Sequence, residues 1–122
     1  MNHFQFIKGQ LHAEDVDLRE IVKKLGTPFY CYSTASLEHN YKRFADAIST
    51  LNADICYAIK ANSNLAVVTT LAGMGAGADV VSVGELKRAL LAGIPANKIV
   101  FSGVGKTSED LKIALTRGVK QI

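Results

Sequence analysis

A lysine at the end of an apolar segment is the residue of this sequence best suited to chemistry. Residues 54–64 read DICYAIKANSN, so that Lys60 follows the apolar stretch directly. Apolar surroundings remove hydration from a charged amine, which lowers the pKa of a lysine and makes it a better nucleophile. Such an amine can bind an aldehyde as a Schiff base. The alternative is a lysine that extends from a strand end into water.

The side chains around this lysine divide between the two faces of the predicted strand. Alternation places Tyr57 and Ile59 on one face, and Ala58 and Lys60 on the other. If helices cover the bulky face, the small residues leave an opening beside Lys60 at the carboxyl end of the strand, where α/β barrels place their chemistry. Ordinary core packing explains the small side chain of Ala58 equally well.

A second polar group, Asp79, lies within the apolar segment 78–81 that follows a glycine-rich turn. An unpaired carboxylate in an apolar strand is costly, so Asp79 requires a partner. Asp79 is therefore either part of a site or a structural residue that accepts hydrogen bonds from backbone amides of the turn.

Strand and helix patterns alternate along most of the chain. Short apolar segments predict five strands, the first at 29–32, and a helix is predicted after each of the first four. The strand starts lie near residues 29, 54, 78, 98 and 119, in steps of 20 to 25 residues. This rhythm predicts an α/β fold with a parallel sheet and right-handed crossovers. An open doubly wound sheet and a (β/α)8 barrel both produce it.

The first 26 residues follow a different pattern. Residues 4–7 and 10–12 predict a hairpin with Gly9 in its turn. Asp17, with Glu20 three positions later, predicts the start of a helix that Gly26 ends. We therefore divide the chain into an N-terminal hairpin and helix, 1–26, and an α/β unit, 27–122.

The composition is that of a globular protein, with 48% hydrophobic and 20% charged residues among 122. The net charge of +3 is scattered, without a cluster of basic and aromatic residues, which argues against nucleic acid as a partner. The apolar runs are short and no secretory signal is visible, so we expect no membrane span and a cytoplasmic location. No metal site is expected, and Cys31 and Cys56 are predicted to be buried free thiols.

The segment GVGKT at 103–107 is similar to the end of a phosphate-binding loop. That loop requires the pattern G-x-x-x-x-G-K-[ST], so that backbone amides surround the phosphates. Val100 occupies the position of its first glycine. The pattern therefore argues against nucleotide binding, which nucleotide titration would test.

Three segments together resemble the pyridoxal phosphate (PLP) decarboxylases built on the alanine-racemase-like barrel. They are YAIKANSN at 57–64, GAGADVVSVGEL at 75–86 and FSGVGKT at 101–107, in the order of that family. The chain looks most like the bacterial diaminopimelate decarboxylases, over essentially its whole length. The resemblance implies a (β/α)8 TIM-type barrel. Four βα units and the start of a fifth strand are about half of such a barrel, so the chain looks truncated.

The resemblance also implies an activity, the PLP-dependent decarboxylation of meso-diaminopimelate to lysine by the intact protein as a homodimer. Lys60 matches the lysine that holds the cofactor, and Asp79 matches an aspartate near it that can orient the amine or tune its protonation. Ala58 matches a residue that lines the cofactor ring. In the family the groups that hold the phosphate and the pyridine nitrogen come from later segments, so the chain alone is expected to be inactive.

Two alternatives remain open. The chain can be a non-catalytic half-barrel that buries its open edges against another chain, because exposed strand edges and apolar surfaces favour association. It can also belong to a PLP decarboxylase that acts on another basic amino acid or on carboxynorspermidine, because the substrate-binding residues come from later segments in the resembled family.

Overall fold

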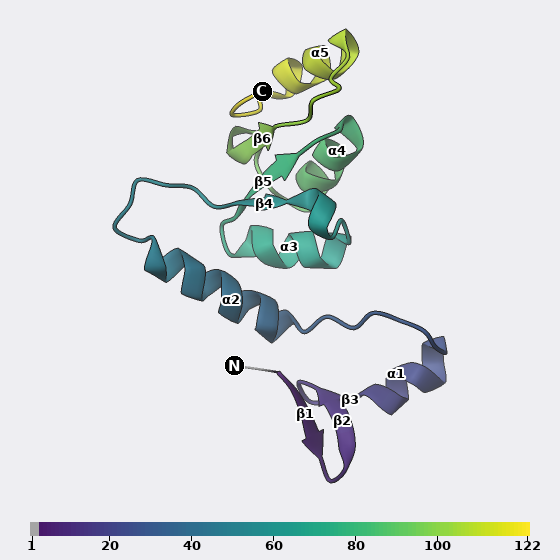
Figure 1. Cartoon of the computed structure of the whole chain (residues 1–122). Coiled ribbons are helices and arrows are strands. Elements are labelled where there is room, and N and C mark those ends of the chain that lie inside the picture. The colour runs from purple at the N-terminus through teal and green to yellow at the C-terminus, as the bar shows by residue number, and fades with distance from the viewer. Residues whose placement is uncertain (1–2) are drawn as a thin grey trace.

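The computed structural model describes residues 3–122, whose elements follow one another along an elongated molecule (Figure 1). At the N-terminal end, β1 (Phe4–Ile7), β2 (Gln10–Ala13) and β3 (Val16–Asp17) form an antiparallel sheet that is followed by α1 (Leu18–Leu25). The helix α2 (Thr34–Ala47) is the first element of the α/β unit and lies between the N-terminal sheet and the rest of that unit (Figure 1). The other elements of the α/β unit are β4 (Cys56–Ala58), η1 (Ile59–Ala61), α3 (Leu65–Gly73), β5 (Gly77–Val80), α4 (Val83–Leu91), η2 (Ala96–Lys98), β6 (Ile99–Phe101) and α5 (Ser108–Arg117), where η marks a 3-10 helix.

The predicted N-terminal hairpin is confirmed, and β3 adds one strand to it. β1 pairs with β2 around a turn in which Lys8 and Gly9 both have positive φ. Glu14 joins this sheet to α2, because its carboxylate accepts hydrogen bonds from the Ser33 hydroxyl at 2.7 Å and from the Ala35 N–H at 2.9 Å. The Ser33 hydroxyl, followed by the Ala35 amide, lowers the pKa of Glu14.

Asp17 is the N-cap of α1, as the sequence predicted. Its carboxylate accepts a hydrogen bond from the Arg19 N–H at 2.9 Å and pairs with the Arg19 guanidinium. The hydrogen bonds from the Arg19 side chain, and then from its backbone, lower the pKa of Asp17 to about 2. Gly26, at a φ of 76°, ends the helix as predicted.

The stability that Asp17 contributes should therefore depend on pH in a defined window. Because its folded pKa is depressed to about 2, this contribution is present above about pH 4 and is lost as the pH falls through about 2. Arg19→Gln removes the guanidinium, and we expect the pKa of Asp17 to rise toward its ordinary value. Carboxyl-carbon NMR titration checks both statements, and an equal midpoint in the two proteins would contradict this cause.

The α/β unit is built on a parallel sheet in the order β4-β5-β6. α3 connects β4 to β5, and α4 connects β5 to β6. Gln121 extends the sheet, because it forms a parallel bridge with Val100 and its carbonyl accepts a hydrogen bond from the Phe101 N–H at 2.8 Å. The predicted α/β class with a parallel sheet is thus confirmed, and the segment predicted as a fifth strand begins to pair beside β6.

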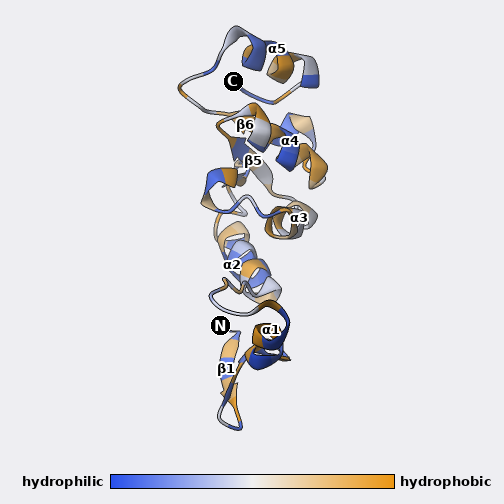
Figure 2. Ribbon diagram, turned by 90° about the vertical axis from the view of Figure 1, so that its right-hand side faces the viewer, coloured by the Kyte–Doolittle hydropathy of each residue, from blue (hydrophilic) through white to orange (hydrophobic). Residues whose placement is uncertain are grey.

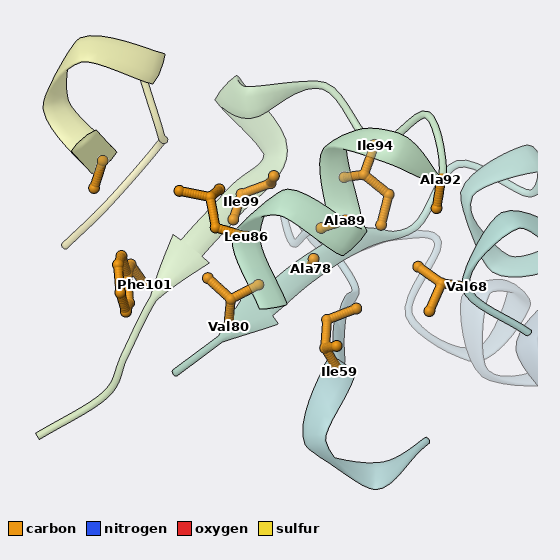
Figure 3. Close-up of a cluster of buried hydrophobic side chains, with 11 residues drawn as sticks. Ile59, Val68, Ala78, Val80, Leu86, Ala89, Ala92, Ile94, Ile99 and Phe101 are labelled. Carbon is orange, nitrogen blue, oxygen red and sulfur yellow. The ribbon is translucent and has the colours of Figure 1, made fainter. Parts of the chain in front are cut away.

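The main hydrophobic core lies between the parallel sheet and its helices (Figure 3). Figure 3 shows α4 beside β5 and β6, with Leu86 and Ala89 among side chains from the strands. Full burial of an aliphatic or aromatic side chain stabilises a fold by about 1.5 to 3 kcal/mol. This core therefore fixes where the carboxyl ends of the strands lie. Its buried members are Ile59, Val68, Ala78, Val80, Leu86, Ala89, Ala92, Ile94, Ile99, Phe101 and Ala114.

The helices differ in how their hydrophobic residues are distributed (Figure 2). α3 is mostly hydrophobic and buries Val67, Val68 and Leu71, whereas α1 and α5 carry hydrophilic and hydrophobic residues on different sides (Figure 2). α2 packs on the second, smaller core cluster through Leu37 and Tyr41. Within residues 3–122, no helix combines the length and the hydrophobicity that crossing a membrane requires.

The strand predicted at 29–32 is wrong, because these residues have no ladder partner within the described chain. Aromatic residues raise strand propensity, but a strand also needs a neighbour for its backbone hydrogen bonds. Tyr30 is 91% exposed, and its ring stacks on Tyr32 at 6.5 Å instead of packing in the core. The helix predicted after this segment is present, as α2, and ends at Ala47.

Candidate active site

The strand register places Ala58, Asp79 and Val100 in one row across the parallel sheet. The neighbouring residues Ala78 and Ile99 are fully buried under the helices, so alternation directs this row to the opposite face. The side chains of the row are only partly buried. Ala58 and Asp79 therefore share the face of the sheet that the helices do not cover.

Lys60 lies just beyond this row, in the 3-10 helix η1. The sequence left open whether this lysine lies in apolar surroundings or extends into water, and the structure shows the second arrangement, with Lys60 beyond the end of the strand. The chain leaves strand geometry after Ala58, and Ile59 takes the buried position, as Figure 3 shows at the end of β4. Lys60 is therefore exposed, and within residues 3–122 its amine has no hydrogen bond or ion pair.

Asp79 has the partner that its position requires. The Ser102 hydroxyl donates to Asp79 Oδ1 at 2.5 Å, and the Ser102 N–H donates to the Val80 carbonyl at 2.9 Å. The carboxylate is thus held by the residue that follows β6, and not by amides of the glycine-rich turn. Ser102 was not predicted as a site residue. The sequence signal for it was a serine directly after a predicted strand, at the same edge of the sheet to which Asp79 lies close.

Ser102→Ala should lower the stability of the protein because it leaves the half-buried Asp79 carboxylate without its hydroxyl donor. We expect a loss of about 1 kcal/mol, since water replaces part of the bond. Ser102→Thr keeps the hydroxyl and is the matched control. Urea unfolding measures both variants, and equal stability of Ser102→Ala and the parent would show that the bond contributes nothing.

Lys106, in the loop after β6, makes its contacts within that loop and with β6. The Lys106 amine donates to the Gly103 carbonyl at 2.6 Å and lies 5.5 Å from the centre of the Phe101 ring. A Cβ on Gly103 would lie 2.5 Å from the Val81 carbonyl oxygen, so the loop also needs glycine here for close packing on β5. The Lys106 amine is thus bound to a carbonyl of its own loop, which agrees with the sequence argument against a phosphate-binding loop.

The polar residues that follow Lys60 and β5 begin helices. Asn64 is the N-cap of α3 and accepts a hydrogen bond from the Ala66 N–H at 2.9 Å. Ser82 is the N-cap of α4, and the Glu85 carboxylate accepts from the Val81 N–H at 2.8 Å. These side chains cap helices, so we do not include them in the candidate site formed by Lys60, Ala58 and Asp79.

The cysteine thiols lie outside this group. Cys31 and Cys56 are free and partly buried, and burial raises the pKa of the Cys56 thiol. The Cys56 thiol lies 3.9 Å from the Lys98 carbonyl, at the amino end of β4. Within residues 3–122, no group of three or more histidine, cysteine, aspartate or glutamate side chains is arranged to hold a metal ion.

The arrangement at the carboxyl edge of the sheet suits a ligand that reacts with an amine. Ligands of parallel α/β proteins bind at this edge. Here it offers an exposed primary amine on Lys60, a small side chain at Ala58 and a carboxylate at Asp79 that a hydroxyl already holds. The amine can attack a carbonyl carbon, and the carboxylate can accept a hydrogen bond or a proton.

The chain is similar to proteins of known activity. Residues 34–122 match the family described as pyridoxal-dependent decarboxylase, pyridoxal binding domain. A diaminopimelate decarboxylase of Pseudomonas fluorescens is 53% identical over 119 residues, which are 98% of this chain and 29% of that protein. The chain therefore spans less than a third of the length of this relative.

Solved structures agree with the sequence match. Diaminopimelate decarboxylase from M. jannaschii, in complex with L-lysine, superposes with a TM-score of 0.92 at 35% identity, over 98% of this chain and 29% of that one. A lysine/ornithine decarboxylase from Vibrio vulnificus, in complex with cadaverine, has a TM-score of 0.76 at 25% identity, over 84% of this chain and 28% of that one. The chain therefore belongs to the pyridoxal-dependent decarboxylases and matches their pyridoxal-binding domain.

Proposed function

We propose that Lys60 holds PLP covalently and that the intact protein decarboxylates meso-diaminopimelate to L-lysine. The observation that carries this proposal is the position of an unpartnered Lys60 amine beside the row of Ala58 and Asp79. The 53% identity to a diaminopimelate decarboxylase supports the choice of substrate.

The residues present fit this cofactor. Its aldehyde requires a free primary amine, which Lys60 offers without a competing partner among residues 3–122. The small side chain of Ala58 leaves space for a planar ring on the sheet face beside it. Asp79 adds a carboxylate on the same face, and its bond to Ser102 fixes its orientation.

PLP, when bound, supplies an electron sink for the pair released as carbon dioxide leaves. The residues of this chain contribute attachment and orientation. Lys60 supplies the nitrogen that attaches the cofactor, and its exposure leaves the amine accessible to an incoming aldehyde. Asp79 supplies a carboxylate on the sheet face next to the Lys60 turn, which can accept a hydrogen bond from the bound group.

The wider architecture follows from the same proposal. Residues 27–122 are part of the N-terminal half of a (β/α)8 barrel, in which β4, β5 and β6 are successive barrel strands and the segment at Gln121 begins the next one, and residues 1–26 are associated with a separate β domain. The intact protein is a cytoplasmic homodimer. Since this chain covers 29% of the relative from Pseudomonas fluorescens, we expect no appreciable turnover from the 122 residues alone.

The test is carbon dioxide release by the intact protein with added PLP. We expect meso-diaminopimelate to yield L-lysine, and ornithine and arginine to react much more slowly. Faster release from ornithine or arginine would instead favour a decarboxylase of another basic amino acid, a class to which the neighbour from Vibrio vulnificus belongs. Absence of release from all of these substrates would contradict the proposal.

A second candidate is a non-catalytic interaction fragment. β4 forms one edge of the parallel sheet, and Tyr30 and Tyr32 are 91% and 54% exposed. Unpaired strand edges and exposed aromatic rings favour association. Light scattering and borohydride trapping of PLP separate the two candidates, because a dimer without a trapped cofactor supports the fragment, whereas an adduct lost in Lys60→Ala supports the enzyme.

A further inference from the structure

The turn that carries Lys60 is closed by a side chain from the strand before it. The Tyr57 hydroxyl donates a hydrogen bond to the Asn62 carbonyl at 3.1 Å. The donor lies three residues before Lys60 and the acceptor two residues after it, so the bond spans the 3-10 helix η1. Such a bond restricts the backbone of every residue between its ends.

Tyr57 is well placed to hold this turn. Its ring is partly buried and packs against both hydrophobic clusters of the α/β unit, one through the strands and one beside α2. Burial raises the pKa of the Tyr57 phenol, so the hydroxyl remains a donor throughout the neutral range. The turn is thereby connected to both hydrophobic clusters.

The residues on both sides of Lys60 are fixed, whereas its own side chain is not. Before it, Ile59 is fully buried in the core. After it, the Asn62 carbonyl is held by Tyr57, and the Ser63 carbonyl accepts a bond from the Arg88 guanidinium at 3.3 Å. The backbone at Lys60 is thus held from β4 and from α4, while its amine stays free to react.

We infer that Tyr57 is a positioning residue for Lys60, which sets the direction from which the amine meets a carbonyl group. This inference rests on the proposed attachment of PLP to Lys60. Its effect is expected on the rate of attachment, because orientation of a nucleophile changes the rate of a covalent step. Tyr57 itself contacts neither the amine nor the reacting carbon in this proposal.

The test is Tyr57→Phe in the intact protein, with Tyr41→Phe as the matched control. Tyr41 is also a partly buried tyrosine that packs on the smaller cluster, but it lies on α2 and not at the Lys60 turn. Removing only the hydroxyl keeps both rings in place. Hydrogen exchange of residues 59–62 reports on the turn, and the rate of borohydride-trapped PLP attachment reports on Lys60.

We expect Tyr57→Phe to increase hydrogen exchange in the turn and to slow PLP attachment, each by about fivefold to tenfold. Exchange in β5 and β6 should stay unchanged, and Tyr41→Phe should match the parent in both measurements. Parent-like attachment in Tyr57→Phe would overturn the inference while leaving the proposed function intact. Failure of the parent protein to attach PLP at Lys60 would overturn both.

Discussion

Lys60→Ala should reduce decarboxylation by the intact protein at least about a thousandfold, which corresponds to about 4 kcal/mol of lost transition-state stabilisation. The reason is that the substitution removes the nitrogen through which the cofactor is attached and oriented. The folded structure should be unaffected, because the side chain is exposed and has no partner among residues 3–122.

Two further variants separate the amine from its charge. Lys60→Arg keeps a positive charge but replaces the nucleophilic amine with a guanidinium that stays protonated, so it should be as inactive as Lys60→Ala. Lys87→Ala removes an exposed lysine from α4 and should retain full activity. Steady-state rates of carbon dioxide release check all three, and substantial activity in Lys60→Arg would show that only the charge matters.

Gly77→Ala should destabilise the protein by about 3 kcal/mol, a larger effect than most single substitutions produce. An added Cβ would overlap the Lys98 carbonyl oxygen and would lie 3.0 Å from the Cys56 sulfur. The carbonyl cannot move away easily, since it belongs to the backbone that leads into β6. The strand that carries Asp79 would therefore shift relative to its neighbours.

Gly73→Ala is the matched control for this effect. Gly73 is the last residue of α3, and an added Cβ would meet no heavy atom within 4 Å. Alanine favours a helix over glycine by up to about 1 kcal/mol, so this variant should be as stable as the parent or slightly more stable. Urea unfolding compares the two, and equal midpoints for Gly77→Ala and the parent would refute the packing argument.

The sequence predicted the elements of the site better than it predicted its contacts. Alternation along the strand was enough to predict the face of Ala58, and the parallel register then aligned Asp79 with Ala58, whereas Lys60 lies beyond the strand. Helix starts at Asn64 and Ser82 were also predictable, because capping depends on residues only a few positions apart.

Contacts that depend on the tertiary arrangement were not predictable. The bond between Asp79 and Ser102 joins residues 23 positions apart and exists only because β5 and β6 pair in one particular register. The turn at Lys60 was missed because the apolar pattern continues through Ile59, although the strand geometry ends at Ala58. Residues 29–32 show the converse, since strand propensity without a pairing partner does not make a strand.

The central claim, that the Lys60 amine carries the cofactor, is tested most directly by locating the attachment site. The intact protein would be incubated with PLP, reduced with borohydride, digested and mapped by mass spectrometry. We predict one modified peptide, with the PLP-derived mass on Lys60. A label on another lysine, or an equal yield of label from Lys60→Ala, would contradict the account.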